Sequence, residues 1–433
     1  MFALVFFVIS ISVFPYNTVE LTFIWHEGSL GENLIELAKE YTAETGVVVR
    51  GELAPWSEWH NRIAGDFAAK GGKYDLTIFD SQSMSEFASK NYVVLLNPFL
   101  DKSAQIKVSD FEPTALKQYA EYPEESGNLY ALPVNQDAMG LAYRKDLFES
   151  PAEMEAFKKK YGTGLKAPRT YSELRDIAEF FTRPDQNLYG IALFGSPEYD
   201  AVTSSFNNIL WSFGGELWNS KSNKVEGILN STESVAALEF YRDLFRFAPP
   251  GLEKHFYNEV NEALQKGTAA MGIQWYYFFG LLGDRTKSPH AEHLAFAPLP
   301  GQTGNDGKFR QYNIVGGQGI SISEFSTKKE EAWKFLEWFM SRETQWKWVR
   351  SGAQTGRTDI LKSPGYAKIN SYNAYFPVSM SRVKDYWHLV EYPQLLEIYQ
   401  NYASSAVAGK ISAKEALDRT AAEHEALLQK NHR

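Results

Sequence analysis

Cysteine is absent from the 433 residues of the chain, so disulfides, thiol nucleophiles and thiolate metal sites are excluded. The absence does not settle the compartment, because exported proteins can also avoid cysteine. Basic runs longer than three residues are absent too, and the net charge is −9 with an isoelectric point near 5.6. The sequence therefore lacks the basic patch that is typical of nucleic-acid-binding proteins. A neutral or weakly polar ligand fits this charge balance better.

Several catalytic motifs are also missing from the sequence. It contains no zinc-protease motif, phosphate-binding loop or dinucleotide fingerprint, and no Gly-x-Ser-x-Gly elbow. His290 and His293 lie close together after Pro289, but without further ligands nearby they indicate a polar surface turn rather than a metal site. We therefore expect no metal and no cofactor, and we expect the protein not to be an enzyme.

One apolar run stands out, at residues 2–14, and no second run is long enough to span a bilayer. Its length matches the apolar region of a signal peptide. We expect residues 1–17 to be a signal peptide and the mature protein to be periplasmic or extracellular. No Lys or Arg precedes the run and no clear cleavage site follows it, so a misassigned start or a first buried strand remains an alternative.

Aromatic residues are abundant, since Trp, Tyr and Phe make up 15% of the chain. This is more than the core of a protein of this size needs, so some of the rings should line a surface cleft. The length also exceeds a single hydrophobic core, because domains usually run about 100 to 200 residues. We therefore expect two α/β lobes.

Strands and helices alternate near the start of the chain. Apolar runs predict strands at residues 19–25, 47–53 and 74–79, with helices at 31–45 and around 63–68. Later strands are expected at 138–143, 189–194, 267–273, 294–299 and 319–323, and later helices at 206–213, 231–247, 328–341, 395–407 and 413–428. Thr170 and Glu173 form a capping-box pattern that predicts the start of another helix. The alternation predicts parallel sheets covered by helices on both faces.

Polar side chains stand at the carboxyl ends of several apolar runs. They are Asp80 and Gln82 after one run, Asn135, Gln136 and Asp137 after another, and Gln318 in a glycine-rich turn. In an open α/β sheet this is where small ligands bind. Asp80 could instead cap a helix that begins near residues 83–85. The arrangement favours a small-molecule receptor.

Short segments spread along the mature chain carry a family resemblance. They are residues 74–80, 130–133, 141–148, 168–174, 211–215, 263–271, 332–336 and 414–417. Each is weak alone, but their order and spacing are specific. Together they make the chain resemble the extracellular solute-binding proteins of carbohydrate uptake, the receptor components of ABC transporters.

The resemblance implies the type II periplasmic-binding-protein fold, which is α/β with two lobes, each a mostly parallel sheet flanked by helices. Three crossings of the chain would join the lobes, near residues 134–138, 272–275 and 321–327. We expect one lobe at residues 18–135 plus 274–322 and the other at 136–273 plus 323–433. Ligand would be trapped as the lobes close. The family also implies a monomer whose partner is the permease of an ABC transporter in the membrane.

Sugars and polyols present hydroxyls around a partly apolar skeleton, so their sites pair carboxylates and amides with aromatic faces. The polar strand ends, the rings and the resemblance together indicate a set of ligand-binding residues. The set is Trp25, Glu27, Trp56, Asp80, Gln82, Asn135, Gln136, Asp137, Trp211, Trp275, Tyr276, Gln318 and Arg357. Trp25 and Trp211 could instead belong to the core.

Two further members of this set have a structural alternative. Trp56 and Trp59 flank the same loop, and we expect one of them to stack on ligand and the other to pack. Arg357 lies in a loop that the resemblance places toward the cleft, but it could instead form an ion pair with Asp359.

Three functions remain open from the sequence. The first is high-affinity capture of a sugar or polyol, without chemistry, and its delivery to an ABC importer. The second is a glycoside hydrolase that uses paired carboxylates such as Glu27 and Asp80, held about 5–5.5 Å or 6.5–9.5 Å apart. Against it, the chain lacks the eightfold strand–helix repeat of barrel hydrolases. The third is a sensor that reports ligand occupancy to a membrane receptor.

Overall fold

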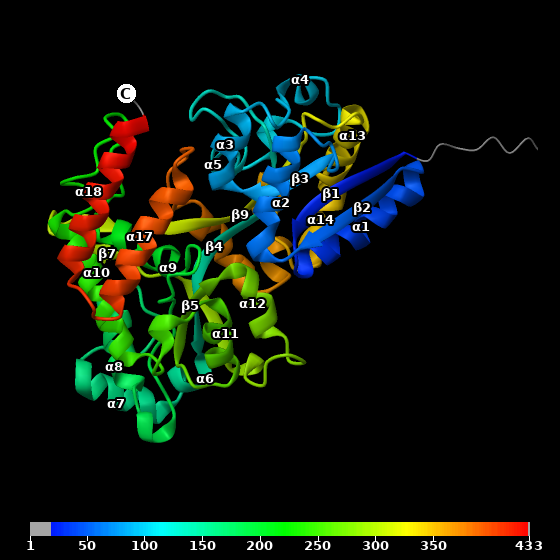
Figure 1. Ribbon diagram of the computed structural model, residues 1–433. Helices are drawn as coiled ribbons and strands as arrows, with labels where there is room; N and C mark the ends of the chain where they lie inside the picture. Colours follow the sequence, from blue (N-terminus) through cyan, green and yellow to red (C-terminus); the bar gives the residue numbers. More distant parts are fainter. Residues whose placement is uncertain (1–18, 432–433) are drawn as a thin grey trace, which may run out of the picture.

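The computed structural model describes residues 19–431, so the signal peptide expected at residues 1–17 lies outside the described residues. The strands are β1 (Glu20–His26), β2 (Val48–Ala54), β3 (Leu76–Asp80), β4 (Leu132–Arg144), β5 (Met271–Trp275), β6 (Leu294–Pro298), β7 (Gln302–Thr303), β8 (Phe309–Arg310), β9 (Asn313–Ile322) and β10 (Val383–Lys384). The main sheet has the order β2-β1-β3-β9-β4-β5, with β6 beside β4 and β10 beside β9. It runs through two lobes (Figure 1).

The long strands β4 and β9 carry the chain from one lobe to the other. They pair antiparallel from Leu132 opposite Ile320 to Ala138 opposite Val315. In one lobe, β1 pairs parallel with β2 and β3. In the other lobe β4 pairs antiparallel with β5 and β6. The sheet is therefore mixed rather than mostly parallel in each lobe, because two strands that traverse both lobes run in opposite directions.

Buried apolar side chains form two clusters, one in each lobe. The smaller cluster draws on residues 21–134 and 320–353, and the larger on residues 138–315 and 349–428. Ala115 and Tyr119 are exceptions, because they join the larger cluster. We call the part of the chain around the smaller cluster the first lobe and the part around the larger cluster the second lobe.

These clusters place two segments differently from the expected lobe boundaries. Tyr276, Phe279 and Leu282 pack in the second lobe, although residues 274–322 were expected in the first. Trp333 and Leu336 pack in the first lobe, although residues 323–433 were expected in the second. Contacts between residues far apart in the sequence determine the lobe in which each of these two segments packs.

The chain crosses between the two clusters at one expected place and at two others. β4 crosses at residues 134–138, as expected. β9 makes the second crossing between Val315 and Ile320, and the third falls between Ala353 and Ile360. Residues 272–275 are not a crossing, because β5 and the helix after it both pack in the second lobe.

Helices cover both lobes (Figure 1). Those of the first lobe are α1 (Ser29–Thr45), α2 (Trp56–Ala69), α3 (Met84–Ser89), α4 (Asn97–Leu100), α5 (Pro113–Tyr119), α13 (Lys329–Phe339) and α14 (Arg342–Arg350). Those of the second lobe are α6 (Lys145–Phe148), α7 (Pro151–Tyr161), α8 (Tyr171–Phe181), α9 (Ala201–Phe213), α10 (Thr232–Leu244), α11 (Tyr257–Gln265), α12 (Tyr276–Gly283), α15 (Thr358–Leu361), α16 (Phe376–Met380), α17 (Tyr392–Val407) and α18 (Ala413–Asn431). Every helix among residues 19–431 is too short or too polar to span a membrane.

The predicted capping box at the start of α8 is confirmed. The N–H of Glu173 donates to the hydroxyl of Thr170 at 3.1 Å, and the N–H of Thr170 donates to the carboxylate of Glu173 at 3.3 Å. These two bonds satisfy backbone donors that the first turn of a helix leaves free. The local sequence therefore determines where α8 begins.

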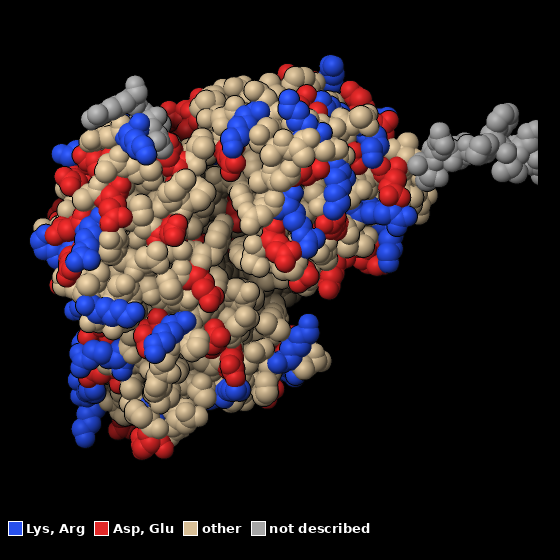
Figure 2. Space-filling model, viewed as in Figure 1, with Lys and Arg blue, Asp and Glu red and all other residues tan. Residues whose placement is uncertain are grey.

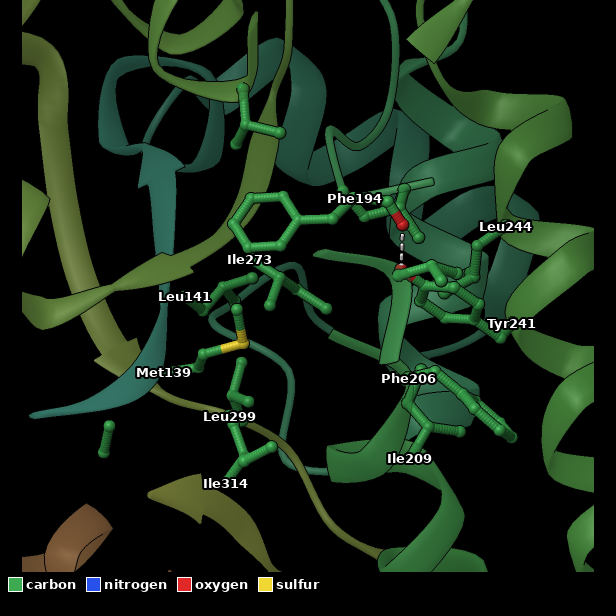
Figure 3. Close-up of a cluster of buried hydrophobic side chains, with 14 of the residues drawn as sticks. Met139, Leu141, Phe194, Phe206, Ile209, Tyr241, Leu244, Ile273, Leu299 and Ile314 are labelled. Carbon is green, nitrogen blue, oxygen red and sulfur yellow. Dashed lines mark hydrogen bonds between the residues drawn. The ribbon is translucent and has the colours of Figure 1, made fainter. Parts of the chain in front are cut away.

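Figure 3 shows the centre of the second core, where side chains of β4 and α9 such as Leu141 and Phe206 gather. The hydroxyl of Tyr241 in α10 donates a hydrogen bond to the carbonyl of Phe194. Phe194 ends the segment 189–194, which was expected to be a strand. That segment makes isolated bridges instead of a ladder. The chain leaves this buried segment directly into the cleft between the lobes.

Candidate ligand-binding cleft

A cavity of about 310 Å³ lies where the two lobes meet. The carboxyl ends of β1 and β3 contribute from the first lobe, α11 and α12 from the second, and the crossing strands β4 and β9 from between them. Eight residues of the expected set line it: Glu27, Trp56, Asp80, Gln82, Asn135, Asp137, Trp275 and Gln318. We predict that these side chains contact the ligand.

Asp80 ends β3 and lines the cavity. Its Oδ1 accepts a hydrogen bond of 2.9 Å from the Nε2 of Gln318, and its Oδ2 accepts one of 3.0 Å from the hydroxyl of Tyr199. Burial raises the pKa of Asp80 to about 6. Its side chain makes no capping bond to the helical turn that follows. The carboxylate thus lines the cleft and does not cap the helix near residues 83–85.

The three consecutive polar residues of β4 divide between two faces of the strand, because successive side chains point to opposite sides. Asn135 and Asp137 line the cavity, whereas Gln136 is fully buried away from it. The Oδ1 of Asp137 accepts hydrogen bonds from the backbone N–H groups of Ala138 at 2.8 Å and Tyr277 at 3.3 Å. Burial raises the pKa of Asp137 to about 8. The expectation of ligand contact for Gln136 is corrected by this alternation.

Trp275 ends β5 and Tyr276 begins α12, so the two side chains leave the backbone in different directions. The ring of Trp275 lies against the backbone of Gly316, where an added Cβ would stand 2.5 Å from the ring. Tyr276 is 1% exposed and its hydroxyl lies 3.0 Å from that of Ser379. Tyr277 lines the cavity in its place. The expectation for Tyr276 is therefore corrected, and Tyr277 becomes the candidate.

Trp25 and His26 alternate on β1 in the same way. Trp25 is fully buried, and its ring centroid lies 6.3 Å from that of Trp348 in the first core. The core alternative for Trp25 is therefore correct. His26 lines the cavity, and burial lowers its pKa to about 4. The imidazole is thus neutral at pH 7.

Trp56 and Trp59 divide the two roles expected of them. Trp56 is 39% exposed and lines the cavity, and its ring centroid lies 4.7 Å from that of His26. Trp59 is buried, and its Nε1 donates a hydrogen bond of 2.9 Å to a backbone carbonyl of β3. Trp56 is thus free to stack on ligand, whereas Trp59 anchors α2 to the sheet.

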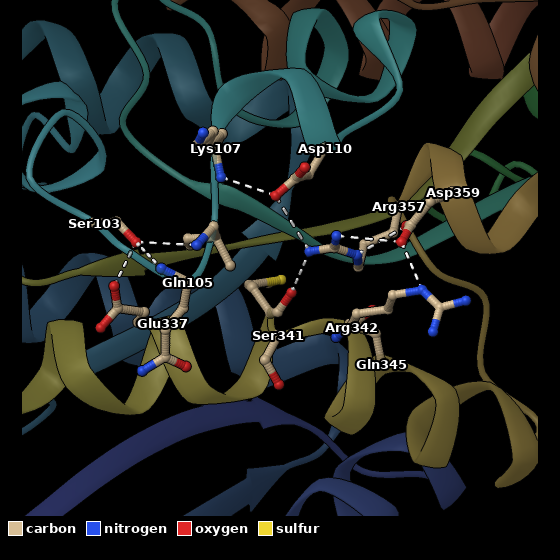
Figure 4. Close-up of polar contacts among 12 residues, drawn as sticks. Ser103, Gln105, Lys107, Asp110, Glu337, Ser341, Arg342, Gln345, Arg357 and Asp359 are labelled. Carbon is tan, nitrogen blue, oxygen red and sulfur yellow. Dashed lines mark hydrogen bonds and ion pairs between the residues drawn. The ribbon is translucent and has the colours of Figure 1, made fainter.

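Trp211 and Arg357 lie outside the cavity. Trp211 is 1% exposed within the second core. The guanidinium of Arg357 lies 3.0 Å from the carboxylate of Asp359 and 3.5 Å from that of Asp110, and it donates to the carbonyl of Met340 at 3.0 Å (Figure 4). Both expectations of ligand contact are corrected, by core packing for Trp211 and by ion pairing for Arg357.

The cavity also has lining residues that lay outside the expected set, among them His26, Tyr199, Asp200, Phe256, Tyr257, Tyr277 and Phe278. Tyr199 adopts a left-handed backbone with φ of 41°, which is uncommon for a bulky residue. Its ring centroid lies 5.9 Å from that of Trp56 across the cleft. Tyr199 and Asp200 come after the apolar segment that ends at Phe194. Like Asp80, they are polar residues that follow an apolar run, so the same sequence pattern applies to them.

A wider groove of about 860 Å³ adjoins the cavity. The two share lining residues such as Trp56, Asp80 and Tyr199. Residues of α2 border the groove from the first lobe and residues of α17 from the second. Figure 2 shows the molecule hollowed between the lobes at this place. A ligand can therefore reach the cavity through the cleft.

Residues 26–346 match the family model of the bacterial extracellular solute-binding proteins. The chain belongs to this family. It is 26% identical over 284 residues to the mannitol-binding protein of Pseudomonas aeruginosa, a match that covers 65% of this chain and 59% of that protein. It is 22% identical over 327 residues to the erythritol/L-threitol-binding protein of Mycolicibacterium smegmatis, covering 73% of this chain and 65% of that protein. The chain thus spans less than two thirds of the length of these two solute-binding proteins.

Solved structures of other solute-binding proteins match nearly the whole chain. One is an ABC transporter solute-binding protein from Agrobacterium radiobacter K84 in complex with ribitol, with 25% identity, a TM-score of 0.80, and coverage of 94% of this chain and 98% of that one. Another is maltose-bound MalE3 of T. maritima, with 24% identity, a TM-score of 0.80, and coverage of 94% and 100%. The expected two-lobe fold of type II periplasmic binding proteins is confirmed.

Proposed function

We propose that this protein captures a sugar or polyol outside the cytoplasm and delivers it to an ABC importer. The cavity between the lobes carries the proposal, because it joins polar acceptors and amides to aromatic faces. Carboxylates such as Asp80 accept hydrogen bonds from hydroxyls, and amides such as Asn135 both donate and accept. The rings of Trp56 and Trp275 can cover the apolar side of a sugar or polyol.

The size of the cavity favours a small ligand. Its volume of about 310 Å³ lies at the lower end of the usual range for small-molecule sites, roughly 300 to 1,000 Å³. One sugar ring or one linear polyol suits this volume, and a longer saccharide would extend into the adjoining groove. Relatives named for mannitol and for erythritol and L-threitol, and a similar structure in complex with ribitol, support the same class of ligand.

Closure of the lobes would turn binding into a signal. The crossings in β4, in β9 and between residues 353 and 360 form a narrow connection about which rigid lobes can rotate. A ligand that contacts both lobes stabilises the closed form, and the permease would then distinguish the closed from the open receptor. We propose that the protein is exported by the segment at residues 1–17 and works as a monomer.

We infer that the cleft performs no chemistry. In the hydrolase alternative Glu27 and Asp80 would form the carboxylate pair, and one of them would have to protonate a glycosidic oxygen. Both carboxylate oxygens of Asp80 already accept hydrogen bonds, from Gln318 and Tyr199. That arrangement suits a fixed acceptor better than a proton donor. A sensor for a membrane receptor would use the same cleft and differ only in its partner.

A thermal-shift screen tests the proposal. Purified protein is heated with mannitol, ribitol, erythritol, maltose, glucose and amino acids, and each compound that raises the melting temperature is analysed by chromatography afterwards. Binding to the native state raises the melting temperature by mass action. A sugar or polyol that stabilises the protein and is recovered intact supports capture. Consumption of the compound supports the hydrolase, and stabilisation by amino acids alone contradicts the proposal.

A further inference from the structure

The cavity is lined by carboxyl groups without a matching cation. Glu27, Asp80, Asp137 and Asp200 line it, and no Lys or Arg of the described chain does so. His26 also lines it, but its pKa of about 4 leaves the ring neutral at pH 7. None of the lining residues therefore supplies a positive charge that could pair with the carboxylates.

Nearby residues beyond the lining do not supply this charge either. Burial raises the pKa of Asp137 to about 8, that of Asp200 to about 7 and that of Asp80 to about 6. The negative charge of Asp80 also raises the pKa of Asp200. No Lys or Arg within residues 19–431 offsets these three shifts. Burial therefore disfavours the ionised form of the carboxyl groups that line the cavity.

Gln82 gives an independent sign that a hydrogen-bond donor is missing. It lines the cavity, is 8% exposed, and its Oε1 has no hydrogen-bond partner among the described residues. Its Nε2 donates to the carboxylate of Asp385 at 3.3 Å. Because a carboxylate accepts hydrogen bonds, this contact fixes the orientation of the amide and leaves Oε1 unpaired. A buried acceptor without a partner is costly, so a donor on the ligand would relieve it.

The rings of the cavity suit a cation as well as a sugar. Trp56, Tyr257 and Tyr277 line it from both lobes. An aromatic face attracts an ammonium group through the ring quadrupole. The rings alone do not decide between a neutral and a cationic ligand, because both can pack on them. The carboxyl groups without a cation decide for the cation, and the amide oxygen of Gln82 adds only that the ligand brings a hydrogen-bond donor.

We propose that the ligand is a sugar or polyol that carries a protonated amine, that is, an amino sugar or an aminopolyol. This inference rests on the proposed capture of a sugar or polyol and narrows its class. The ammonium would lie beside Asp200, and hydroxyls would bind Asp80 and Asn135. Asp200 is assigned to the ammonium because the one hydrogen bond to its carboxylate within the described chain comes from its own backbone N–H. Asp80 and Asp137 already accept hydrogen bonds from other residues.

Isothermal titration with matched ligand pairs tests this inference on the intact protein at pH 7. The pairs are mannitol with 1-amino-1-deoxymannitol, ribitol with 1-amino-1-deoxyribitol, and glucose with glucosamine. Each pair differs by one protonated amine in place of a hydroxyl. In the pair that binds most tightly, we expect the amine to bind at least about tenfold more tightly than its neutral partner, because the charge is paired in a poorly solvated site.

Two variants then test whether Asp200 causes the preference for the amine. Asp200→Asn keeps the shape of the side chain, and it should lower the preference for the amine at least about fivefold. Asp185→Asn removes the same charge from an exposed turn outside the cavity and should leave the preference unchanged. Equal or tighter binding of the neutral partner in the wild-type protein overturns this inference and leaves the proposed function standing. Binding of no member of any pair overturns this inference, and it overturns the proposed function as well if erythritol and maltose also fail to bind.

Discussion

The hydroxyl of Tyr199 donates a hydrogen bond of 3.0 Å to the Oδ2 of Asp80 across the cleft. Tyr199 precedes α9 of the second lobe, and Asp80 ends β3 of the first. A second contact crosses the cleft nearby, where the hydroxyl of Ser81 donates to the carboxylate of Asp385 at 2.7 Å. Side chains of the protein therefore join the lobes directly. We therefore expect closure of the lobes to have a component that does not depend on ligand.

Replacement of Tyr199 by Phe tests that component. The variant keeps the ring and loses the hydrogen bond, which contributes about 1 kcal/mol to the closed form. We expect the unliganded variant to open more than the wild type, and small-angle scattering should show a larger radius of gyration. Tyr375→Phe is a matched control, because Tyr375 is 40% exposed and lines neither the cavity nor the groove. Equal radii for wild type and Tyr199→Phe without ligand would contradict this role.

The stability of the unliganded protein should fall as the pH rises from 6.5 to 8. The raised pKa values of Asp137 and Asp200 mean that the folded state holds protons which the unfolded chain has already released. His388 acts in the same direction, because burial opposes its charge but the bond to Asp385 raises its pKa. The lowered pKa of His26 has its effect between pH 4 and 6.5, below this window. Each proton difference contributes up to about 1.4 kcal/mol per pH unit.

Urea denaturation at pH 6.5, 7, 7.5 and 8 measures this slope. Asp137→Asn removes the titrating group and should flatten the fall in the free energy of unfolding. Asp185→Asn, which alters an exposed aspartate, should leave the slope as it is in the wild type. A wild-type free energy of unfolding that is constant or increases across this range would refute the assignment of raised pKa values to the cavity.

Trp275 should provide much of the apolar contact with ligand. Its ring lies between the crossing strand at Gly316 and the cavity. We expect Trp275→Ala to weaken binding by more than about tenfold, which corresponds to about 1.4 kcal/mol. Trp346→Ala is the control, because Trp346 is a partly buried tryptophan that lines neither the cavity nor the groove. Unchanged affinity in a folded Trp275→Ala protein would remove this residue from the site.

Arg357 should matter for stability and not for affinity. It is 5% exposed and pairs with Asp359 and Asp110. Replacement by Met leaves both carboxylates and the carbonyl of Met340 without this donor, so we expect a loss of about 2 to 4 kcal/mol in the free energy of unfolding. Calorimetric titration should give a dissociation constant within about threefold of the wild type, since no cavity contact is lost. A large loss of affinity with unchanged stability would restore Arg357 to the site.

Local patterns of the sequence predicted much of the lining of the cavity, because the end of an apolar run is a local feature. Asp80 and Trp275 end β3 and β5, whereas Asn135 lies inside β4 after a short apolar run, and all three line the cavity. The alternation of strand side chains would also have separated Asn135 from Gln136 once the whole of β4 was recognised as strand. Tyr199 also comes after an apolar segment, but that segment forms only isolated bridges and a loop separates it from Tyr199, so the pattern of a strand end does not point to this residue.

The assignment of segments to lobes could not be predicted in the same way. Helices α12 and α13 both have an apolar side, and the sequence does not say which sheet that side covers. The structure packs Phe279 in the second lobe and Leu336 in the first. Such contacts join residues far apart in the chain, so they follow from the path of β9 rather than from local periodicity.

Isothermal titration of the best stabilising sugar, polyol or amino derivative, followed by chromatography of the sample, tests the central claim most directly. The account predicts saturable binding of one molecule per chain with a dissociation constant of about 1 μM or lower, and recovery of the compound unchanged. Heat that does not saturate, or a compound that is converted during the titration, would contradict the claim that the cleft between the lobes is a receptor site for a small polyhydroxylated ligand.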